Sequence, residues 1–400
     1  MFVPFVLEGE AVEATVTEEK PGFVRARAEQ IAAGSAHRIQ AGCPYYGACG
    51  GCHYQHSSYE HQLEIKKSIL KENLRRIAKL ELEAEPVVHA SKPWNYRNRS
   101  RFKVRSQPEF ALGYYRFNSH ELLPVEQCPI SSAAINRAIQ QLWEMGRSRT
   151  VHAELQEIEI FANAEDDQLL VELCCDRACE EKAALEIAEA VKASVTAAVG
   201  VTAFRSSGPG QSEKIATVGA GELVCETESA SYRVSAGTFF QANWHVMDEL
   251  VRIVTEGVSG ETALDLYAGV GLFSSVLAGS FAQVYAVESS PTSQEDLAYN
   301  SPANVRAVRS TTDQFLKNKG RKLRPDLVVV DPPRGGLGEV VVRSLGALGA
   351  RAVTYVSCDP ATLSRDLAGL LKAGYRIQQA HVVDLFPQTY HIESVFRLSL

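Results

Sequence analysis

Two residues near the C-terminal end could act together as a nucleophile and a base. Cys358 ends an apolar run over residues 355–357 that is typical of a buried strand, and Glu393 follows 35 residues later. A pyrimidine that reacts at C5 needs a nucleophile at C6 and a base that removes the C5 proton. We therefore expect Cys358 to be the nucleophile and Glu393 the general base. The alternative for a cysteine at a strand end is an inert core residue.

The thiol must be partly ionised before it can attack a ring carbon. Residues 361–371, directly after Cys358, are predicted to form a helix. The N-terminus of a helix carries partial positive charge, which favours a thiolate beside it. The sequence thus predicts that the helix start helps to ionise Cys358.

A glycine-containing turn after a predicted strand indicates a site for an adenosine-bearing donor. The apolar run 263–267 leads into Gly269 and Gly271, and the next predicted strand ends at Glu288. Glycines let the backbone approach a ligand at the strand end, and an acid on the second strand can bind ribose hydroxyls. Dinucleotide and S-adenosylmethionine folds share this arrangement. Ser274 stands where a dinucleotide fingerprint has its third glycine, which favours S-adenosylmethionine.

Two further residues are expected at the donor site. Asp331 ends the apolar run 327–330 and precedes two prolines, so we expect it at the mouth of the site beside the donor or the substrate base. Gln241 follows two aromatic residues, and we expect it to bond polar groups of the donor. The alternatives are a turn or cap residue for Asp331 and a capping amide beside a core aromatic pair for Gln241.

Four of the nine cysteines have the spacing of a metal-binding set. Three lie close together in a C-x5-C-x2-C pattern with glycines between them, and a fourth lies 76 residues further on. This pattern suits a four-iron cluster better than zinc, whose structural ligands more often come in two pairs, although zinc or no metal stays open. The expected ligands are Cys43, Cys49, Cys52 and Cys128. The other five include Cys358 and four expected to be small buried residues, namely Cys174, Cys175, Cys179 and Cys225.

Charge is unevenly distributed, in a way that favours RNA as the partner. The net charge is −7, yet residues 92–120 carry seven Lys and Arg residues against one Glu, while residues 151–190 carry twelve acids against two bases. The basic segments 94–103 and 113–120 also contain aromatic and amide residues, which could stack unpaired bases and hold phosphates. The alternative is a pair of amphipathic strands with a solvated charged face.

Length and patterning predict several domains of mixed α/β type. Four hundred residues are too many for one typical domain. Short strands are expected over residues 2–7, 11–18 and 23–31, and a helix over 57–80 with an apolar face of Ile65, Ile69, Leu70, Leu74 and Ile77. Residues 231–400 alternate strand and helix, which predicts a parallel, doubly wound sheet. No apolar run is long enough to span a membrane and no signal peptide is evident, so we expect a cytoplasmic protein.

Together these motifs resemble the iron–sulfur branch of the RNA (uracil-5-)-methyltransferases, which modify 23S ribosomal RNA. The resemblance extends over the whole chain and rests on the cysteine set and on FFQAN, DLYAGVG, DPPRGG, SCDPATLSRDL and FPQTYHIE. It implies a nucleophile at Cys358 and a base at Glu393. It also implies cluster ligands at Cys43, Cys49, Cys52 and Cys128, and donor contacts at Gln241, Tyr267, Glu288 and Asp331.

The chain departs from this family at two places. Asp359 replaces the usual Asn after the nucleophile, where its charge is expected to raise the pKa of the thiol. The N-terminal segment resembles a TRAM domain, a small OB-like barrel, that begins midway. The expected domains are a partial TRAM-like segment over 1–40, a central iron–sulfur and RNA-binding domain over 41–230, and a Rossmann-like S-adenosylmethionine methyltransferase domain over 231–400. Helix 57–80 is expected to pack on the last of these.

The function expected from the resemblance is S-adenosylmethionine-dependent methylation of a uridine at C5 through a covalent cysteine–C6 adduct. The first choice of substrate is 23S rRNA, with tRNA as the alternative, and the expected cofactors are S-adenosyl-L-methionine and a [4Fe–4S] cluster. Two other classes remain open at this point, a non-catalytic iron–sulfur RNA-binding protein and a nucleotide-dependent redox enzyme. We expect a monomer without an obligate protein partner.

Overall fold

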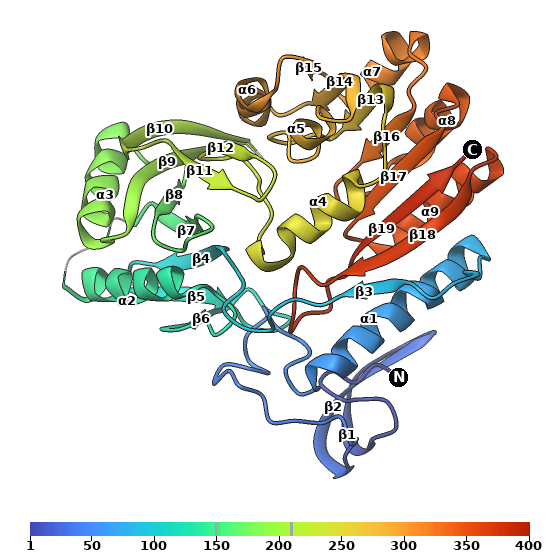
Figure 1. Ribbon diagram of the computed structural model, residues 1–400. Helices are drawn as coiled ribbons and strands as arrows, with labels where there is room; N and C mark the ends of the chain where they lie inside the picture. Colours follow the sequence, from blue (N-terminus) through green and yellow to red (C-terminus); the bar gives the residue numbers. More distant parts are fainter. Residues whose placement is uncertain (149–150, 152, 209–210) are drawn as a thin grey trace.

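Two mixed sheets, each covered by helices, form most of the molecule (Figure 1). The computed structural model describes residues 1–148, 151, 153–208 and 211–400. The C-terminal sheet has eight strands and the central sheet seven, and each has its own buried hydrophobic cluster. The mixed α/β class expected from the alternating pattern is confirmed.

The C-terminal sheet has the order β15-β14-β13-β16-β17-β19-β18-β3, in which the first five strands are parallel and β19 runs antiparallel to its neighbours. Its strands are β13 (Gly260–Leu266), β14 (Phe281–Glu288), β15 (Val305–Arg309), β16 (Leu327–Val330), β17 (Ala352–Ser357), β18 (Arg376–Val383), β19 (Glu393–Ser399) and β3 (Val87–His89). All four residues of β16 are buried, as expected for a parallel strand covered on both faces.

Helices of the C-terminal half alternate with these strands, in agreement with the doubly wound pattern. They are α4 (Met247–Thr255), α5 (Ser274–Leu277), α6 (Pro291–Asn300), α7 (Thr312–Asn318), α8 (Gly338–Leu348) and α9 (Pro360–Lys372), with short 3-10 turns η2 (Trp244–Val246) and η3 (Gly320–Lys322). The helix expected over 361–371 is therefore confirmed as α9.

The central sheet has the order β10-β9-β8-β7-β4-β5-β6. Its strands are β4 (Arg99–Arg105), β5 (Ala111–Tyr115), β6 (Leu122–Pro124), β7 (Leu155–Ala162), β8 (Leu169–Cys175), β9 (Ala198–Gly208) and β10 (Gln211–Gly219). Helices α2 (Ala133–Ser148) and α3 (Glu181–Ser194) pack on it with apolar faces at helical spacing, such as Ile135, Ile139 and Leu142 of α2. A separate hairpin, β11 (Glu222–Glu226) with β12 (Ser231–Ser235), follows in the chain.

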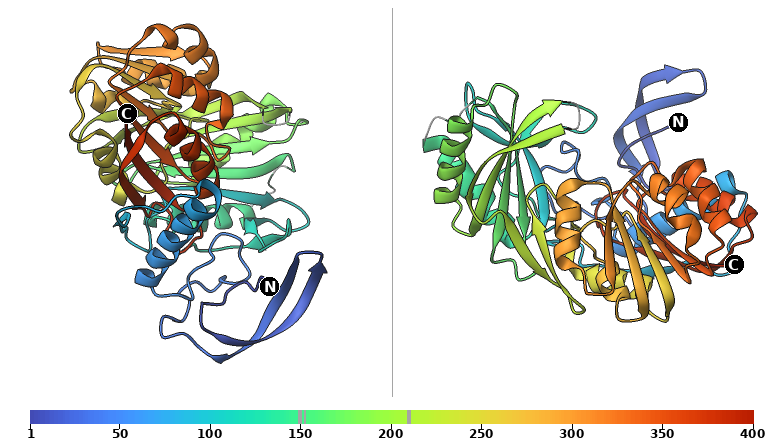
Figure 2. Two further views of the ribbon diagram at one scale, coloured as in Figure 1. Left: turned by 90° about the vertical axis from the view of Figure 1, so that its right-hand side faces the viewer. Right: turned by 90° about the horizontal axis from the view of Figure 1, so that it is seen from above.

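The N-terminal segment is an antiparallel hairpin of β1 (Ala11–Lys20) and β2 (Phe23–Ala33). The strand expected over residues 2–7 does not form; only an isolated bridge joins Phe2 to Arg25. The hairpin lies near the start of α1 (Tyr59–Asn73) in Figure 1 and stands away from both sheets in the second view of Figure 2.

One helix and one strand that precede the central sheet in sequence pack with the C-terminal sheet. Helix α1 (Tyr59–Asn73) continues into a π-helical turn, η1 (Leu74–Ala78), and both pack against α9, while β3 extends the C-terminal sheet beside β18. The expected apolar face of this helix is only partly correct. Ile77 is 43% exposed, whereas Gln62 and Lys66 are buried.

Among the described residues, no helix is both long and apolar enough to cross a membrane.

Candidate functional site

The register of two neighbouring strands brings Cys358 and Glu393 to the same edge of the C-terminal sheet. Strand β17 runs antiparallel to β19, and Ser357 pairs with Ser394. Cys358 follows that pair on one strand and Glu393 precedes it on the other. The Ser394 hydroxyl donates a hydrogen bond of 3.3 Å to the Ser357 carbonyl and closes the strand ends. The thiol and the carboxylate that the sequence singled out are therefore neighbours.

The environment of Cys358 disfavours the thiolate in the free protein. Burial is the first cause that raises the pKa of its thiol to about 11, followed by the negative charges of Glu393 and Asp331, while Arg334 acts in the opposite direction. The net effect of these surroundings is opposite to the help with ionisation that was expected from the start of α9, whose own contribution stays a prediction.

Asp359 has a structural role that the sequence did not indicate. Its carboxylate accepts hydrogen bonds from the backbone N–H groups of Ala361 (3.0 Å) and Thr362 (2.8 Å), so it caps the N-terminus of α9. Burial, Glu393 and Asp331 are the main causes that raise the pKa of the thiol, and Asp359 is not among them. The expected effect of Asp359 on the thiol is replaced by helix capping.

Two carboxylates, those of Glu393 and Asp331, lie close enough to the thiol to raise its pKa. Glu393 is 5% exposed. Burial, and after it the charge of Asp331, holds the pKa of Glu393 well above its ordinary value. Burial, and after it the charge of Asp265, raises the pKa of Asp331 to about 7. Carboxyl groups with raised pKa values beside a thiol are suited to proton transfer near neutral pH.

The expected donor residues on the first two strands lie at the same edge. Leu266 pairs with Val287 of β14 and with Val330 of β16, so Tyr267, Glu288 and Asp331 stand at the ends of adjacent strands. Gly269 and Gly271 after Tyr267 have positive φ angles of 56° and 98°. The turn therefore uses the left-handed conformation that glycine adopts easily.

Glu288 joins the glycine turn to the end of the second strand. Its carboxylate accepts hydrogen bonds from the backbone N–H groups of Gly269 at 3.0 Å and of Ser289 and Ser290 at 2.7 Å. These contacts hold the carboxylate in one orientation at the edge where an adenosine ribose is expected.

Asp265 is a buried acid that the sequence reasoning passed over. It is 0% exposed, and within the described part of the chain neither of its carboxylate oxygens has a hydrogen-bond partner, although Ser274 is near enough to lower its pKa. Burial dominates and raises that pKa to about 7. The signal was a lone acid within the apolar run 263–266, at a position where a strand is covered on both faces. A buried carboxylate without partners is costly unless a ligand completes it.

Gln241 lies on the segment before η2, and its place at the donor site remains a prediction. The residue is 7% exposed, and its backbone carbonyl accepts a hydrogen bond of 3.3 Å from the Asn98 side chain. Asn243, two residues later, donates a hydrogen bond of 3.0 Å to the Leu385 carbonyl. The segment thus links the central sheet to the loop that leads to Glu393.

The four cysteines of the expected cluster line one cavity of about 250 Å³, together with Tyr114, His53 and His391. Burial, and after it the neighbouring thiols Cys128, Cys49 and Cys43, raises the pKa of Cys52 to about 12. Across residues 1–148, 151, 153–208 and 211–400, no group of three or more His, Cys, Asp or Glu side chains could hold a metal ion. The thiols therefore share a cavity, but the metal site is not confirmed.

Much of the expected RNA-binding run 94–103 is occupied by internal contacts. Tyr96 and Phe102 are 1% and 0% exposed, so these rings belong to the protein core and cannot stack on bases. Arg99 pairs with Glu159 and Glu172, and Arg101 also pairs with Glu159. The interpretation of the two rings as a stacking surface is wrong, because Phe102 lies in the core of the central sheet and Tyr96 packs in a small cluster with Cys52 and Ile130. The cations of β4 neutralise acids on β7 and β8.

Comparison with known proteins agrees with this arrangement. Residues 58–399 match the family model described as tRNA (Uracil-5-)-methyltransferase. An uncharacterized RNA methyltransferase of Aquifex aeolicus is 33% identical over 100% of this chain and 93% of the relative, and one of Streptomyces coelicolor is 34% identical over 99% and 86%. The structure of Pyrococcus abyssi tRNA (uracil-54, C5)-methyltransferase in complex with S-adenosyl-L-homocysteine has a TM-score of 0.75 at 24% identity and covers 99% of this chain and 95% of that one, which shows the fold. The chain therefore belongs to the tRNA (uracil-5-)-methyltransferase family and is an S-adenosylmethionine-dependent RNA (uracil-5-)-methyltransferase.

Proposed function

We propose that the protein methylates C5 of a uridine through a covalent adduct between Cys358 and the uracil ring, with 23S rRNA as the first choice of substrate. The observation that carries the proposal is the pairing of Ser357 with Ser394, which makes Cys358 and Glu393 neighbours at the carboxyl edge of the sheet. A nucleophile and a base within reach of one ring are what addition at C6 and deprotonation at C5 require.

Cys358, Glu393 and Arg334 act at different steps of the reaction. The Cys358 thiolate forms a bond to C6, and the electron pair of the C5–C6 double bond moves into the ring as an enolate. C5 then takes the methyl group from the donor sulfonium, which leaves as a neutral thioether. Glu393 removes the C5 proton, the C5–C6 double bond re-forms and the C6–S bond breaks. Arg334 supports the first step, since its charge lowers the pKa of the thiol.

For the donor, we propose that Glu288 binds the ribose and that Tyr267, Asp331 and Gln241 line the site. Asp265 is added to this set because both of its oxygens lack partners in the part of the chain that the structure describes. An ammonium group such as that of the donor methionine would supply the missing partner, either directly or through water.

For the cysteine set, we propose a [4Fe–4S] cluster held by Cys43, Cys49, Cys52 and Cys128. The support is the shared cavity and the all-thiolate donor set, which suits iron–sulfur clusters. Protein purified without air should contain about four iron and four sulfide per chain; folded protein free of iron after reconstitution would contradict the assignment.

For RNA, we propose a path between the β1–β2 hairpin, the TRAM-like part of the chain, and the loop that carries Tyr390. A cavity of about 1110 Å³ there is lined by Arg25, Arg27, Phe117 and Tyr390, and Tyr390 is 51% exposed. Cations with an exposed ring at the approach to the reacting residues suit a single-stranded substrate.

A second substrate class is tRNA, which the family name and the Pyrococcus abyssi protein favour. The deciding experiment supplies labelled S-adenosylmethionine with unmodified 23S rRNA and, separately, unmodified tRNA, and digests both to nucleosides. Label in 5-methyluridine from rRNA alone supports the first choice. Label from tRNA alone replaces the substrate and keeps the chemistry, and no label in either contradicts the proposed function.

A further inference from the structure

The loop between β18 and β19 leads directly to Glu393 and is unusually well buried for a connecting segment. It covers residues 384–392 and is closed at its base by the pairing of Val383 with Glu393. Asp384, Gln388 and Thr389 are only 1–3% exposed. Polar groups buried in a loop need partners from elsewhere in the protein, and here many of these partners come from α1, which lies more than 300 residues earlier in the chain.

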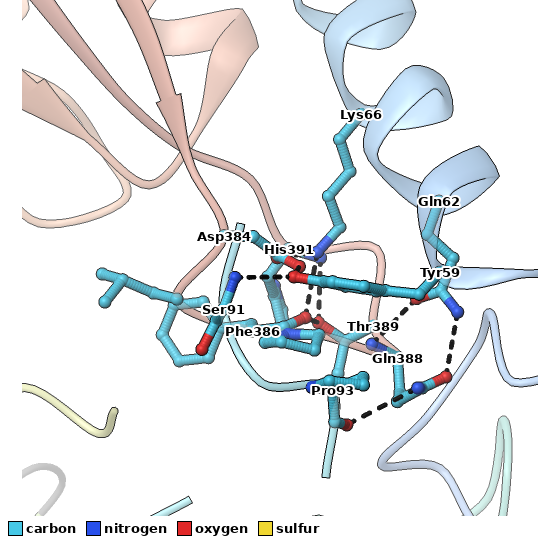
Figure 3. Close-up of polar contacts among 12 residues, drawn as sticks. Tyr59, Gln62, Lys66, Ser91, Pro93, Asp384, Phe386, Gln388, Thr389 and His391 are labelled. Carbon is cyan, nitrogen blue, oxygen red and sulfur yellow. Dashed lines mark hydrogen bonds and ion pairs between the residues drawn. The ribbon is translucent and has the colours of Figure 1, made fainter. Parts of the chain in front are cut away.

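The first contact is a buried ion pair (Figure 3). The ammonium of Lys66, which is 0% exposed, donates hydrogen bonds to Asp384 Oδ1 at 2.6 Å and to the Phe386 carbonyl at 2.9 Å. The Tyr59 hydroxyl donates to Asp384 Oδ2 at 2.8 Å, so both carboxylate oxygens are bound. Two residues of α1 thus fix the start of the loop.

The second contact holds the middle of the loop. The Gln62 amide donates to Gln388 Oε1, and Gln62 Oε1 accepts from the Gln388 backbone N–H, both at 3.0 Å. Gln388 has a φ of 67°, a conformation that costs free energy for a residue other than glycine. The Gln388 carbonyl also accepts hydrogen bonds from the backbone of His53 and Tyr54, which follow Cys52. The loop is therefore fastened to α1 and to the cysteine segment at the same residue.

A third set of contacts connects the α1 side of the loop to its catalytic end. The Phe386 carbonyl that accepts from Lys66 also accepts from the Thr389 hydroxyl at 2.8 Å. The Thr389 hydroxyl in turn accepts from the His391 backbone N–H at 3.2 Å, two residues before Glu393. Hydrogen bonds thus run without a break from Lys66 to His391, two residues before the proposed base.

Burying Lys66 is not explained by stability alone. A buried ion pair often contributes less to stability than apolar residues of the same size, so its retention needs another reason. Tyr59, Gln62 and Lys66 are spaced three and four residues apart and lie on one face of α1. That face is polar although it is turned inward. Directional hydrogen bonds from such a face select one loop conformation, whereas apolar side chains would simply fill the core.

We propose that Tyr59, Gln62 and Lys66 are positioning residues: α1 holds loop 384–392 so that the Glu393 carboxylate meets the C5 proton of the ring. The inference rests on the proposed function, because it assigns these residues to the deprotonation step. Displacing a catalytic group by about 1 Å can lower a rate by on the order of 100-fold, so loosening the loop should slow elimination more than RNA binding.

The test uses the full-length protein with Lys66→Met and Asp384→Asn combined. This variant removes both charges together and leaves no unpaired buried charge, while Asp384→Asn keeps an oxygen for the Tyr59 hydroxyl. Gln62→Leu is a second, independent variant. Lys67→Met is the matched control, because Lys67 is the next residue of α1 but pairs with Glu64 on the partly exposed side of the helix.

We expect the double variant to keep the KM for RNA and the rate of adduct formation within about threefold, while kcat falls by about 10- to 100-fold. Covalent protein–RNA adduct should then accumulate on denaturing gels, and Lys67→Met should behave as wild type. Normal turnover in both the double variant and Gln62→Leu would overturn the inference. So would a loss of adduct formation that follows the fraction of unfolded protein, since that marks a purely structural role. If the wild type makes no 5-methyluridine, the proposed function itself fails, and the inference falls with it.

Discussion

Replacing the proposed base should change two steps of the reaction in opposite directions. Glu393→Gln removes a carboxylate whose charge is the second cause, after burial, of the raised pKa of the Cys358 thiol. The thiol should therefore ionise at lower pH, and addition to C6 should become faster. The same change removes the group that takes the C5 proton, so resolution of the adduct should become much slower.

The expected change in the rate of adduct formation follows from the pKa of the Cys358 thiol. A pKa of about 11 in place of the ordinary 9.0 reduces the thiolate at a given pH by about 100-fold. Burial remains in the variant, so only part of this factor returns, and we expect adduct formation to rise by about 3- to 10-fold. Loss of a general base costs about 100- to 10,000-fold in the step that it serves. Since the pKa of Glu393 is itself raised, adduct formation should be faster in the variant only above the pH at which the wild-type carboxylate ionises.

The assay mixes enzyme, S-adenosylmethionine and end-labelled RNA, quenches in denaturant at intervals, and measures adduct and 5-methyluridine from pH 6 to 10. Asp359→Asn is the control. It removes a negative charge from the residue next to the thiol, but it keeps the N-cap of α9, because Asn caps helices as well as Asp does. Glu393→Gln should accumulate methylated adduct, and the midpoint of its pH profile for adduct formation should lie at lower pH than in the wild type. Asp359→Asn should show neither change. Normal turnover of Glu393→Gln would exclude Glu393 as the base, and an unchanged midpoint for adduct formation would show that its charge does not control the Cys358 thiol.

Three further predictions concern single residues. Asp265→Asn should raise the Tm of donor-free protein at pH 8 but hardly at pH 4. The pKa of Asp265 is raised from the ordinary 3.8 to about 7 in the folded protein, so the protonated acid favours folding at low pH. As the pH rises between these two values, the wild type loses roughly 4 kcal/mol at most of its free energy of unfolding, a loss that the Asn variant avoids. Calorimetry should also show weaker S-adenosylmethionine binding, and an unchanged Tm and affinity would contradict both. Arg334→Met should move the pH profile of adduct formation to higher pH, because Arg334 lowers the pKa of Cys358; a shift to lower pH would be inconsistent with this. Cys52→Ser should lose iron while calorimetric donor binding persists, and full iron content would exclude Cys52 as a ligand.

The positions of the reacting groups along the chain could be predicted from the sequence because they follow from short-range pattern. Apolar runs of strand length that end in Asp331 and Cys358 were recognisable, and carboxyl ends of parallel strands share one edge of a sheet. The helix after Cys358 and the glycine turn after Tyr267 were likewise local signals. Glu393 was identified as the base because it ends the FPQTYHIE motif, and the antiparallel register of β17 and β19 then sets it beside the thiol.

The partners of charged and polar side chains could not be predicted from pattern, because they come from distant parts of the chain. Lys66 lies 318 residues from Asp384, and nothing in the sequence around α1 marks its polar face as the buried one. From the sequence, Tyr96 and Phe102 were expected on a nucleic-acid surface, but Phe102 is buried in the core of the central sheet and Tyr96 is buried against Cys52 and Ile130.

Local pattern along the chain is enough to predict which residue types stand at the strand ends, and hence the class of chemistry. The protonation and orientation of these residues depend instead on how the whole chain packs. The pKa of the Cys358 thiol is set by burial and by Glu393 and Asp331, and Asp359 is committed to the cap of α9. The physical reason is that local pattern fixes where a strand ends, whereas desolvation and Coulomb interactions depend on every group packed around the site, wherever it lies in the chain.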